Sequence, residues 1–132
     1  MSFKTLRSII ADIRDKLLNG VLNADILSTE SSVIDEIDTA SDTSPVTVLT
    51  PTSGYKIDTR SVYASTDSSQ GEVTIAFAGG SLLAKLYCAV HKAVILQEIR
   101  KVGTANEAIQ ISWNGLSNDA KIFYAIRYKE TQ

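Results

Sequence analysis

The feature that most constrains this chain is a run of short, alternating segments between Val46 and Glu130, separated by turn residues. The clearest segment closes the run: apolar and aromatic residues recur at every second position, namely Ile122, Tyr124, Ile126 and Tyr128. Basic residues mark the opposite face, at Lys121, Arg127 and Lys129. A period of two predicts a half-buried β-strand, because successive side chains of a strand point to opposite faces. The chain is therefore expected to be mainly β.

Similar segments, bounded by Gly, Pro, Ser, Asn or Asp, predict further strands. They are Val46–Leu49, Tyr55–Asp58, Ser61–Ala64, Glu72–Phe77, Leu82–Ala89 and Ile109–Trp113. Ala93–Ile99 is also expected to be a strand, although a helix stays open there. As a strand it would place Val94 and Leu96 on one face and Ile95 and Ile99 on the other.

Turn spacing favours a particular β architecture. Gly79-Gly80 predicts a type I′ hairpin between two strands. Seven or eight short strands, with turns every eight to twelve residues, are typical of an antiparallel β-sandwich or jelly-roll-like domain.

The N-terminal stretch SFKTLRSIIADIRDKLLNG has a helical period instead. Its apolar residues are three and four apart and form a narrow stripe: Phe3, Leu6, Ile10, Ile13 and Leu17. This is the a/d pattern of a helix that packs against another helix. Ser2 suits an N-cap and Gly20 a left-handed C-terminal residue. So short a stripe is unstable alone in water, so it must pack on the protein's own sheet, on sister subunits or on a larger partner.

Three zones follow from these patterns. Residues 1-20 are expected to form the N-terminal amphipathic helix, and residues 46-132 the β-sandwich domain. Residues 21-45 are rich in Ser, Thr and Asp and are expected to be a polar arm, with one short element near Ser32–Ile37.

Charge and hydropathy narrow the classes of partner. The formal net charge is −2 and no Lys/Arg run exists, so nucleic acid is not an expected partner. The apolar stretches are far below the roughly 18 residues of a membrane span, and no secretory signal is visible, so a soluble protein without membrane contact is expected. The single cysteine cannot form an internal disulfide.

Catalytic and metal motifs are not recognisable. Cys88 and His91 are the only residues of their types, and a separation of three puts them on opposite faces of a strand. Two such residues cannot supply the four ligands of structural zinc. A nearby acidic group lacks the spacing of a calcium loop; it comprises Asp35, Glu36, Asp38 and Asp42. We therefore expect no enzyme activity, no cofactor and no metal.

Aromatic residues leave one alternative open. Trp113 adjoins the Asn114-Gly115 turn, where its ring would be near a loop edge and able to stack on a sugar. Burial is the more usual fate of an aromatic ring on an alternating strand. A ligand-binding β-sandwich of the glycan type, with Trp113 as the contact, is the alternative to a structural role.

The order of elements resembles a known kind of protein. A short helix, a polar arm and the phrases TPTSGYKIDTRSVYASTD, GEVTIAFAGG, GTANEAIQISWNG and AKIFYAIRYKE are similar to small β-sandwich structural proteins of tailed-phage and related virus particles. Capsid-decoration and fibre-anchoring proteins are the nearest types.

This resemblance implies a non-enzymatic virion protein present in many copies. It would assemble in the host cytoplasm as a homo-oligomer, with a trimer favoured, and would contact other virion proteins at the particle surface or at a head or tail position. The helix stripe would be its assembly interface.

Overall fold

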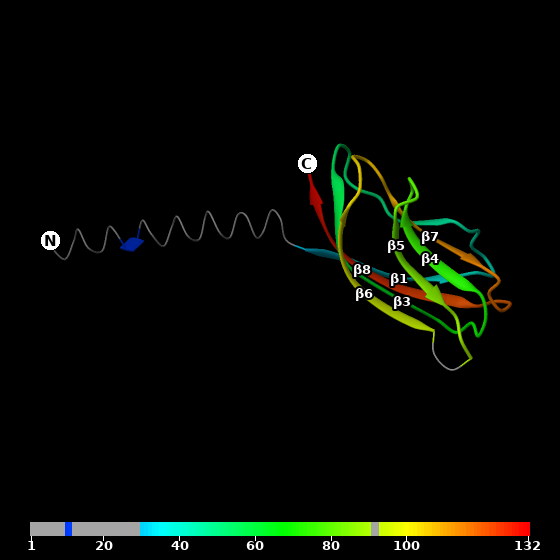
Figure 1. The fold of residues 1–132 in the computed structure, drawn as a ribbon. Helices are drawn as coiled ribbons and strands as arrows, with labels where there is room; N and C mark the ends of the chain where they lie inside the picture. Colours follow the sequence, from blue (N-terminus) through cyan, green and yellow to red (C-terminus); the bar gives the residue numbers. More distant parts are fainter. Residues whose placement is uncertain (1–9, 12–29, 91–92) are drawn as a thin grey trace.

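The computed structural model describes residues 10–11, 30–90 and 93–132, in which eight β-strands form (Figure 1). The strands are β1 (Ser31–Asp38), β2 (Val46–Leu49), β3 (Lys56–Thr66), β4 (Glu72–Phe77), β5 (Leu82–Tyr87), β6 (Val94–Val102), β7 (Ile109–Asn114) and β8 (Lys121–Thr131). Ile10 and Ala11 are helical, and the rest of the expected N-terminal helix lies outside the described residues. No helix in the described ranges has the length and apolarity needed to cross a membrane.

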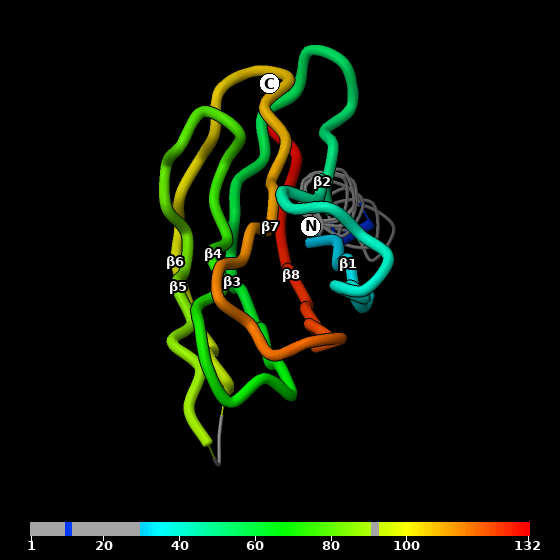
Figure 2. Tube along the Cα trace, turned by 90° about the vertical axis from the view of Figure 1, so that its right-hand side faces the viewer, coloured from blue at the N-terminus to red at the C-terminus, as the bar shows by residue number. Residues whose placement is uncertain are grey.

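The strands form two four-stranded antiparallel sheets. Sheet A has the order β1-β8-β3-β6, and sheet B has the order β2-β7-β4-β5. Figure 1 shows the two layers, and in Figure 2 the strands of both sheets follow matching orders across the molecule. The described part is thus mainly β, with two sheets packed face to face as a sandwich.

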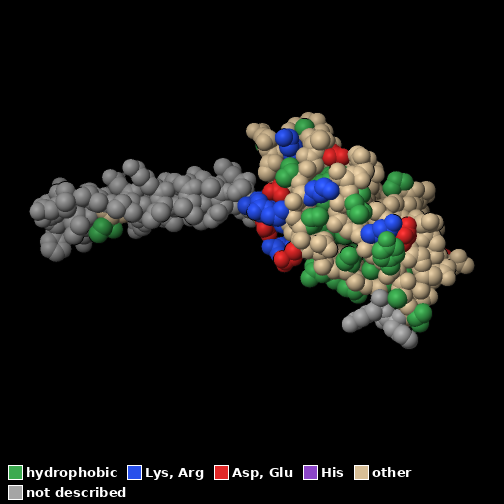
Figure 3. Space-filling view, viewed as in Figure 1, with side chains coloured by type: hydrophobic (Ala, Val, Ile, Leu, Met, Phe, Trp, Pro, Cys, Tyr) green, Lys and Arg blue, Asp and Glu red, His purple; other side chains and the backbone are tan. Residues whose placement is uncertain are grey.

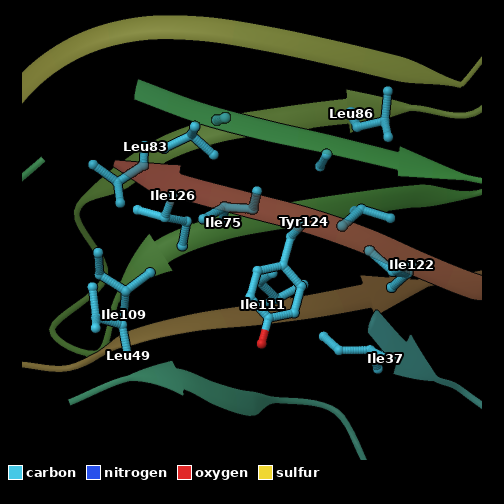
Figure 4. Packing of buried hydrophobic residues seen from close by; sticks show 14 of the residues in the cluster. Ile37, Leu49, Ile75, Leu83, Leu86, Ile109, Ile111, Ile122, Tyr124 and Ile126 are labelled. Atoms are coloured by element: carbon cyan, nitrogen blue, oxygen red, sulfur yellow. The ribbon is translucent and has the colours of Figure 1, made fainter. Parts of the chain in front are cut away.

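The core lies between the sheets and draws on the inward residues of both (Figure 4). Its largest fully buried apolar side chains are Phe77, Ile57, Ile75, Ile109, Ile111, Ile122, Ile126, Val62 and Val73. Burying a side chain of this size stabilises a fold by about 1.5–3 kcal/mol. Since no disulfide crosslinks the chain, this packing is the main source of cohesion.

Several strand predictions are confirmed. β2 and β4 have the expected bounds, and the segment from Ala93 is a strand rather than a helix. In that strand Val94 and Leu96 are exposed, whereas Ile95 and Ile99 pack against the core. In β8 the inward positions are Ile122, Tyr124 and Ile126, all buried.

The expected arm requires a correction. Its residues Ser31–Asp38 form β1, which pairs with β8 along its whole length, so the sandwich begins well before residue 46. The alternation of β1 is hidden in the sequence because apolar Ile34 points outward while Asp35 is on the inward side, opposite Tyr124. An edge strand tolerates this pattern, since one of its sides is open to water.

Two expected strands are one. The predicted strands Tyr55–Asp58 and Ser61–Ala64 merge into the single strand β3, which begins at Lys56 and carries a bulge at Arg60. Thr59 pairs with Tyr128 and Ser61 with Arg127, so Arg60 is an extra residue on its strand. A bulge of this kind bends the strand and redirects the side chain of the inserted residue.

The Gly79-Gly80 turn does join two strands, but the expected type I′ geometry is wrong. The amide of Gly80 donates to the carbonyl of Phe77 at 2.8 Å, and the amide of Phe77 donates to Ser81 at 2.9 Å. Only Gly80 has a positive φ, 102°, whereas type I′ requires two such residues. The geometry matches a three-residue loop that ends in a left-handed glycine.

Candidate functional site

An apolar row crosses the outer face of sheet A, on the side away from the core. Its members are Ile34 on β1, Ala125 on β8, Tyr63 on β3 and Leu96 on β6, each the register partner of the next. Ile34 is 63% exposed and Leu96 66% exposed. Neighbouring strands are about 4.8 Å apart, so the row spans about 14 Å.

More apolar surface flanks the row. The ring of Phe123 meets the ring of Tyr63 edge-on, with centroids 5.8 Å apart, and Val94 lies across β3 from Phe123. Nine large hydrophobic side chains are exposed in the described part of the chain. Five of them are on this face: Ile34, Val94, Leu96, Val102 and Phe123. The outer face of sheet A therefore carries more of these exposed hydrophobic side chains than the outer face of sheet B, which has Leu82 and Tyr87.

Charged side chains of both signs bound this face at the end where β1 begins (Figure 3). The carboxylate of Asp58 accepts from the guanidinium of Arg60 at 3.0 Å and lies 3.6 Å from that of Arg100. Arg127 pairs with Glu30 directly before β1. The bulge on β3 is what brings Arg60 over the nearly buried Asp58.

At the opposite end, Lys121 and Glu36 approach to 3.8 Å. An apolar centre with a charged rim is the usual anatomy of a protein–protein contact surface.

The outer face of sheet B is different. The corresponding row runs through Thr47 on β2, Gln110 on β7, Ala76 on β4 and Leu82 on β5. The side-chain amide of Gln110 donates to the hydroxyl of Thr47 at 3.4 Å. The next rows are largely polar, with Ser112, Thr74, Lys85, Asn114 and Glu72, and the row of Glu72 ends at the exposed Tyr87. This is the composition of a face in contact with water.

Trp113, the residue expected to contact a ligand, is at the end of β7 and lines an open hollow of about 420 Å³. Asn114, Asn118 and Asp119 provide polar groups on the same wall. Trp113 is half-buried and packs against the core, and its amide donates to the hydroxyl of Ser44 at 3.2 Å. The side chain of Trp113 is therefore partly used in packing.

Contacts with the β3–β4 loop hold the hollow in shape. The amide of Ser117 donates to the hydroxyl of the buried Ser68 at 2.9 Å. Gly71, with a φ of 83°, packs so closely on Asn114 and Gly115 that a Cβ there would lie 2.4 Å from the carbonyl oxygen of Asn114. The hollow is thus preformed by backbone packing.

The remaining candidate residues are placed as follows. Of the predicted assembly stripe, Ile10 is described and 58% exposed, while Phe3, Leu6, Ile13 and Leu17 lie outside the described residues.

Cys88 is half-exposed, and burial raises the pKa of its thiol above the ordinary value. His91, expected on the opposite face of a strand, lies outside the described residues.

The acidic group around the β1–β2 turn has a structural role. The amide of Ala40 donates to the carboxylate of Asp38 at 3.0 Å, and the amide of Asp38 donates to that of Asp42 at 3.2 Å. In the ranges 30–90 and 93–132 no three His, Cys, Asp or Glu side chains converge as a metal site would require.

Sequence reasoning did not find the apolar row. Its signal was present in part, since Leu96 and Val94 were assigned to a common face, but Phe123 and Ala125 were overlooked between the basic residues of β8. A row forms only when four strands align, and register between distant strands is not readable from one strand at a time.

Comparisons with known proteins support the architecture. No protein-family model matches the chain, and no curated protein matches it. Among solved structures, a chain of the acid-stable capsid structure of Helicobacter pylori bacteriophage KHP30 superposes with a TM-score of 0.61 at 13% identity, covering 80% of this chain and 94% of that one. The two chains share a fold.

A second similar chain comes from a virus-like particle of the extra small virus of the giant freshwater prawn Macrobrachium rosenbergii. Its TM-score is 0.40 at 11% identity, over 79% of this chain and 81% of that one. The resemblance to structural proteins of virus particles, first stated from the sequence, is confirmed at the level of the fold.

Proposed function

We propose that this protein is a non-enzymatic structural protein of a virus particle, of the capsid-decoration, head or tail accessory, or fibre-anchoring type. The observation that carries the proposal is the fold shared with the bacteriophage capsid chain, which extends over 94% of that chain. Localisation in the virion follows from the same proposal.

The strand order supports it. The orders β1-β8-β3-β6 and β2-β7-β4-β5 place each strand and the next in opposite sheets, except where the β4–β5 hairpin stays within sheet B. We interpret this arrangement of eight strands in two sheets as a jelly roll, an architecture that viral capsid domains use.

The surfaces support a role in assembly. An exposed apolar row with a charged rim is costly for an isolated protein and is useful where copies or partners meet. The N-terminal stripe, of which Ile10 is exposed, is a second such surface. We propose that the protein forms a homo-oligomer, with a trimer favoured, through this stripe, and that it contacts other virion proteins.

The test changes the stripe in the full chain. The double variant Leu6→Glu and Ile13→Glu puts two charges into an apolar contact. It is therefore expected to be monomeric when its mass in solution is measured by light scattering. The matched control, Thr5→Glu with Ser8→Glu, adds the same charge off the stripe and should leave the oligomer intact. A wild-type protein that is monomeric at all concentrations and does not bind virion proteins would contradict the proposal.

A second candidate is a glycan-binding module, favoured by the preformed hollow that Trp113 lines together with two asparagines and an aspartate. An aromatic ring that stacks on a sugar, with amide and carboxylate side chains beside it to bind the hydroxyl groups, is suited to carbohydrate recognition. Glycan-array binding that disappears in Trp113→Ala, with the thermal unfolding curve preserved, would support it. An array without signal for the wild-type chain would exclude the candidate.

A further inference from the structure

We propose that the outer face of sheet A is the docking surface for residues 2–19 of a neighbouring copy, whose apolar stripe covers the apolar row. This inference rests on the proposed function and specifies where the assembling segment of one copy binds on the next.

The first step is that this face is the one that needs a cover. Its row places Ile34, Tyr63 and Leu96 in one line across the sheet with no charged side chain between them. Removing such surface from water is favourable by about 25 cal/mol for each Å². The row of sheet B, through Thr47 and Gln110, has no comparable need.

The second step concerns where the chain leaves the sandwich. β1 begins at Ser31, opposite Tyr128, and the row crosses β1 three residues further on, at Ile34. Glu30, paired with Arg127, therefore stands at the charged end of the sheet, on the side of Ser31 away from the row. Residues 20–30 span at most about 36 Å, which is enough to reach an adjacent subunit. A segment that continued the line of β1 backwards would reach a neighbour's face without reversing direction.

The third step is the match in size and charge. Phe3 and Leu17 are 14 positions apart, a distance of about 21 Å along a helix. The row to be covered spans about 14 Å, so the stripe is long enough to cross it with a margin at each end. Charges of both signs flank the stripe, at Arg7, Asp12, Arg14 and Asp15. The rim of the face also carries both signs, so neither surface repels the other as a whole.

The geometry also provides a matched control. Leu82 occupies the equivalent place on sheet B: both it and Leu96 are leucines on an edge strand, at the end of a four-residue row. Leu82 is 47% exposed. The two leucines therefore differ mainly in the face to which they belong.

The experiment is site-directed disulfide crosslinking between two full-length copies, co-expressed with tags of different size in a Cys88→Ser background. One copy carries Ile10→Cys. The other carries Leu96→Cys, Ile34→Cys or, as the control, Leu82→Cys. A disulfide requires the two Cα atoms to come within about 7 Å, so a product reports direct contact, and two receiving positions allow for the register of the docked segment.

We expect the copy with Ile10→Cys to form a mixed dimer on non-reducing gels with the copy that carries Leu96→Cys or Ile34→Cys. No mixed dimer is expected with the copy that carries Leu82→Cys. A product with the control equal to that with Leu96→Cys, or no mixed product at either receiving position, would overturn the inference. A double variant with Ile10→Cys and Leu96→Cys in one chain that closes only within itself would overturn it too, because the segment would then cover its own sheet.

Light scattering of the same samples separates this failure from failure of the proposed function. An intact oligomer in which Ile10→Cys crosslinks only to Ile10→Cys shows that the stripes pair with one another; it overturns the docking site and leaves the virion role standing. A monomer at every concentration overturns both.

Discussion

The two outer faces of the sandwich are built from the same number of strands in matching orders, yet their side chains differ in polarity. Sheet B presents Thr47, Gln110 and Thr74 to water, and sheet A presents Ile34, Tyr63 and Leu96. The inner faces of both sheets contribute to one core. The contrast is between the outward residues of the two sheets.

The inward and the outward residues of the sheets meet two different requirements. The inward residues are selected by the need to close a core, which any stable sandwich must satisfy. The outward residues of sheet A are not needed for that purpose, and an apolar choice there costs solubility in an isolated copy. Their composition makes sense when sheet A is covered in an assembly and sheet B is not.

The largest expected effect is on the free energy of unfolding. It tests whether, in a single copy, the inner face of sheet A is covered by sheet B while the outer face is open to water. In β8, Ile126→Ala should lower the free energy of unfolding by about 2–5 kcal/mol, because it empties part of a fully buried site. Phe123→Ala on the opposite face removes a partly exposed ring and its edge-on contact with Tyr63, and should cost about 1 kcal/mol. Urea unfolding at low protein concentration measures both. Equal losses would mean that the outer face is covered within the single chain.

The next effect compares the two outer faces directly. Leu96→Glu should raise the dissociation constant between copies about 100-fold, equivalent to roughly 2.7 kcal/mol, since it buries an unpaired carboxylate in the contact. Leu82→Glu on sheet B should leave the constant unchanged. Sedimentation over a range of concentrations gives both values. If the two variants behave alike, the contrast between the faces has no bearing on assembly.

The smallest expected effect is on how stability depends on pH in the acidic range. Glu107 lies away from both rows and joins the β4–β5 hairpin to the β6–β7 loop: its carboxylate accepts from the amides of Thr104 at 2.9 Å and Gly79 at 2.7 Å. The Thr104 amide is the main reason that the pKa of Glu107 is below its ordinary value, and burial opposes the shift.

Because the folded pKa is lowered, this stabilisation is present above the unfolded pKa and is lost as the pH falls through the folded pKa. Glu107→Gln should therefore reduce stability at neutral pH by about 1 kcal/mol or less, given its exposure to solvent, and the difference should vanish in acid. Thermal unfolding across the acidic range measures this. The association of copies at neutral pH should not change, which separates an effect on loop folding from an effect on the outer face of sheet A.

Much of the fold was predictable because the signals are local. The alternation of Ile122, Tyr124 and Ile126 identifies both a strand and its buried side, and the Gly79-Gly80 pair marks a turn. Where the prediction was incomplete, the deciding interaction is distant in sequence. A short element was expected near Ser32–Ile37, but not as part of the sandwich, because Asp35 occupies an inward position; its pairing with β8, some ninety residues later, makes β1 a strand of sheet A.

The candidate site shows the same division. Trp113 was predicted as a ligand contact because an aromatic residue next to an Asn-Gly turn is a local pattern; it lines a hollow, and its contact with a ligand stays a prediction. The apolar row was not found because its four members come from β1, β3, β6 and β8, and each looks unremarkable in its own segment. The stripe of Phe3 to Leu17 stays a prediction, with Ile10 its described member.

The position of β1 has a mechanical consequence. Hydrogen bonds of an antiparallel pair run perpendicular to the strands, and β1 is bonded to β8 along eight consecutive residue pairs. When the body of the sandwich is held, tension directed along the axis of β1 loads this ladder in shear, with all its bonds sharing the strain. A tether attached in this way resists pulling far better than one that peels open from its end.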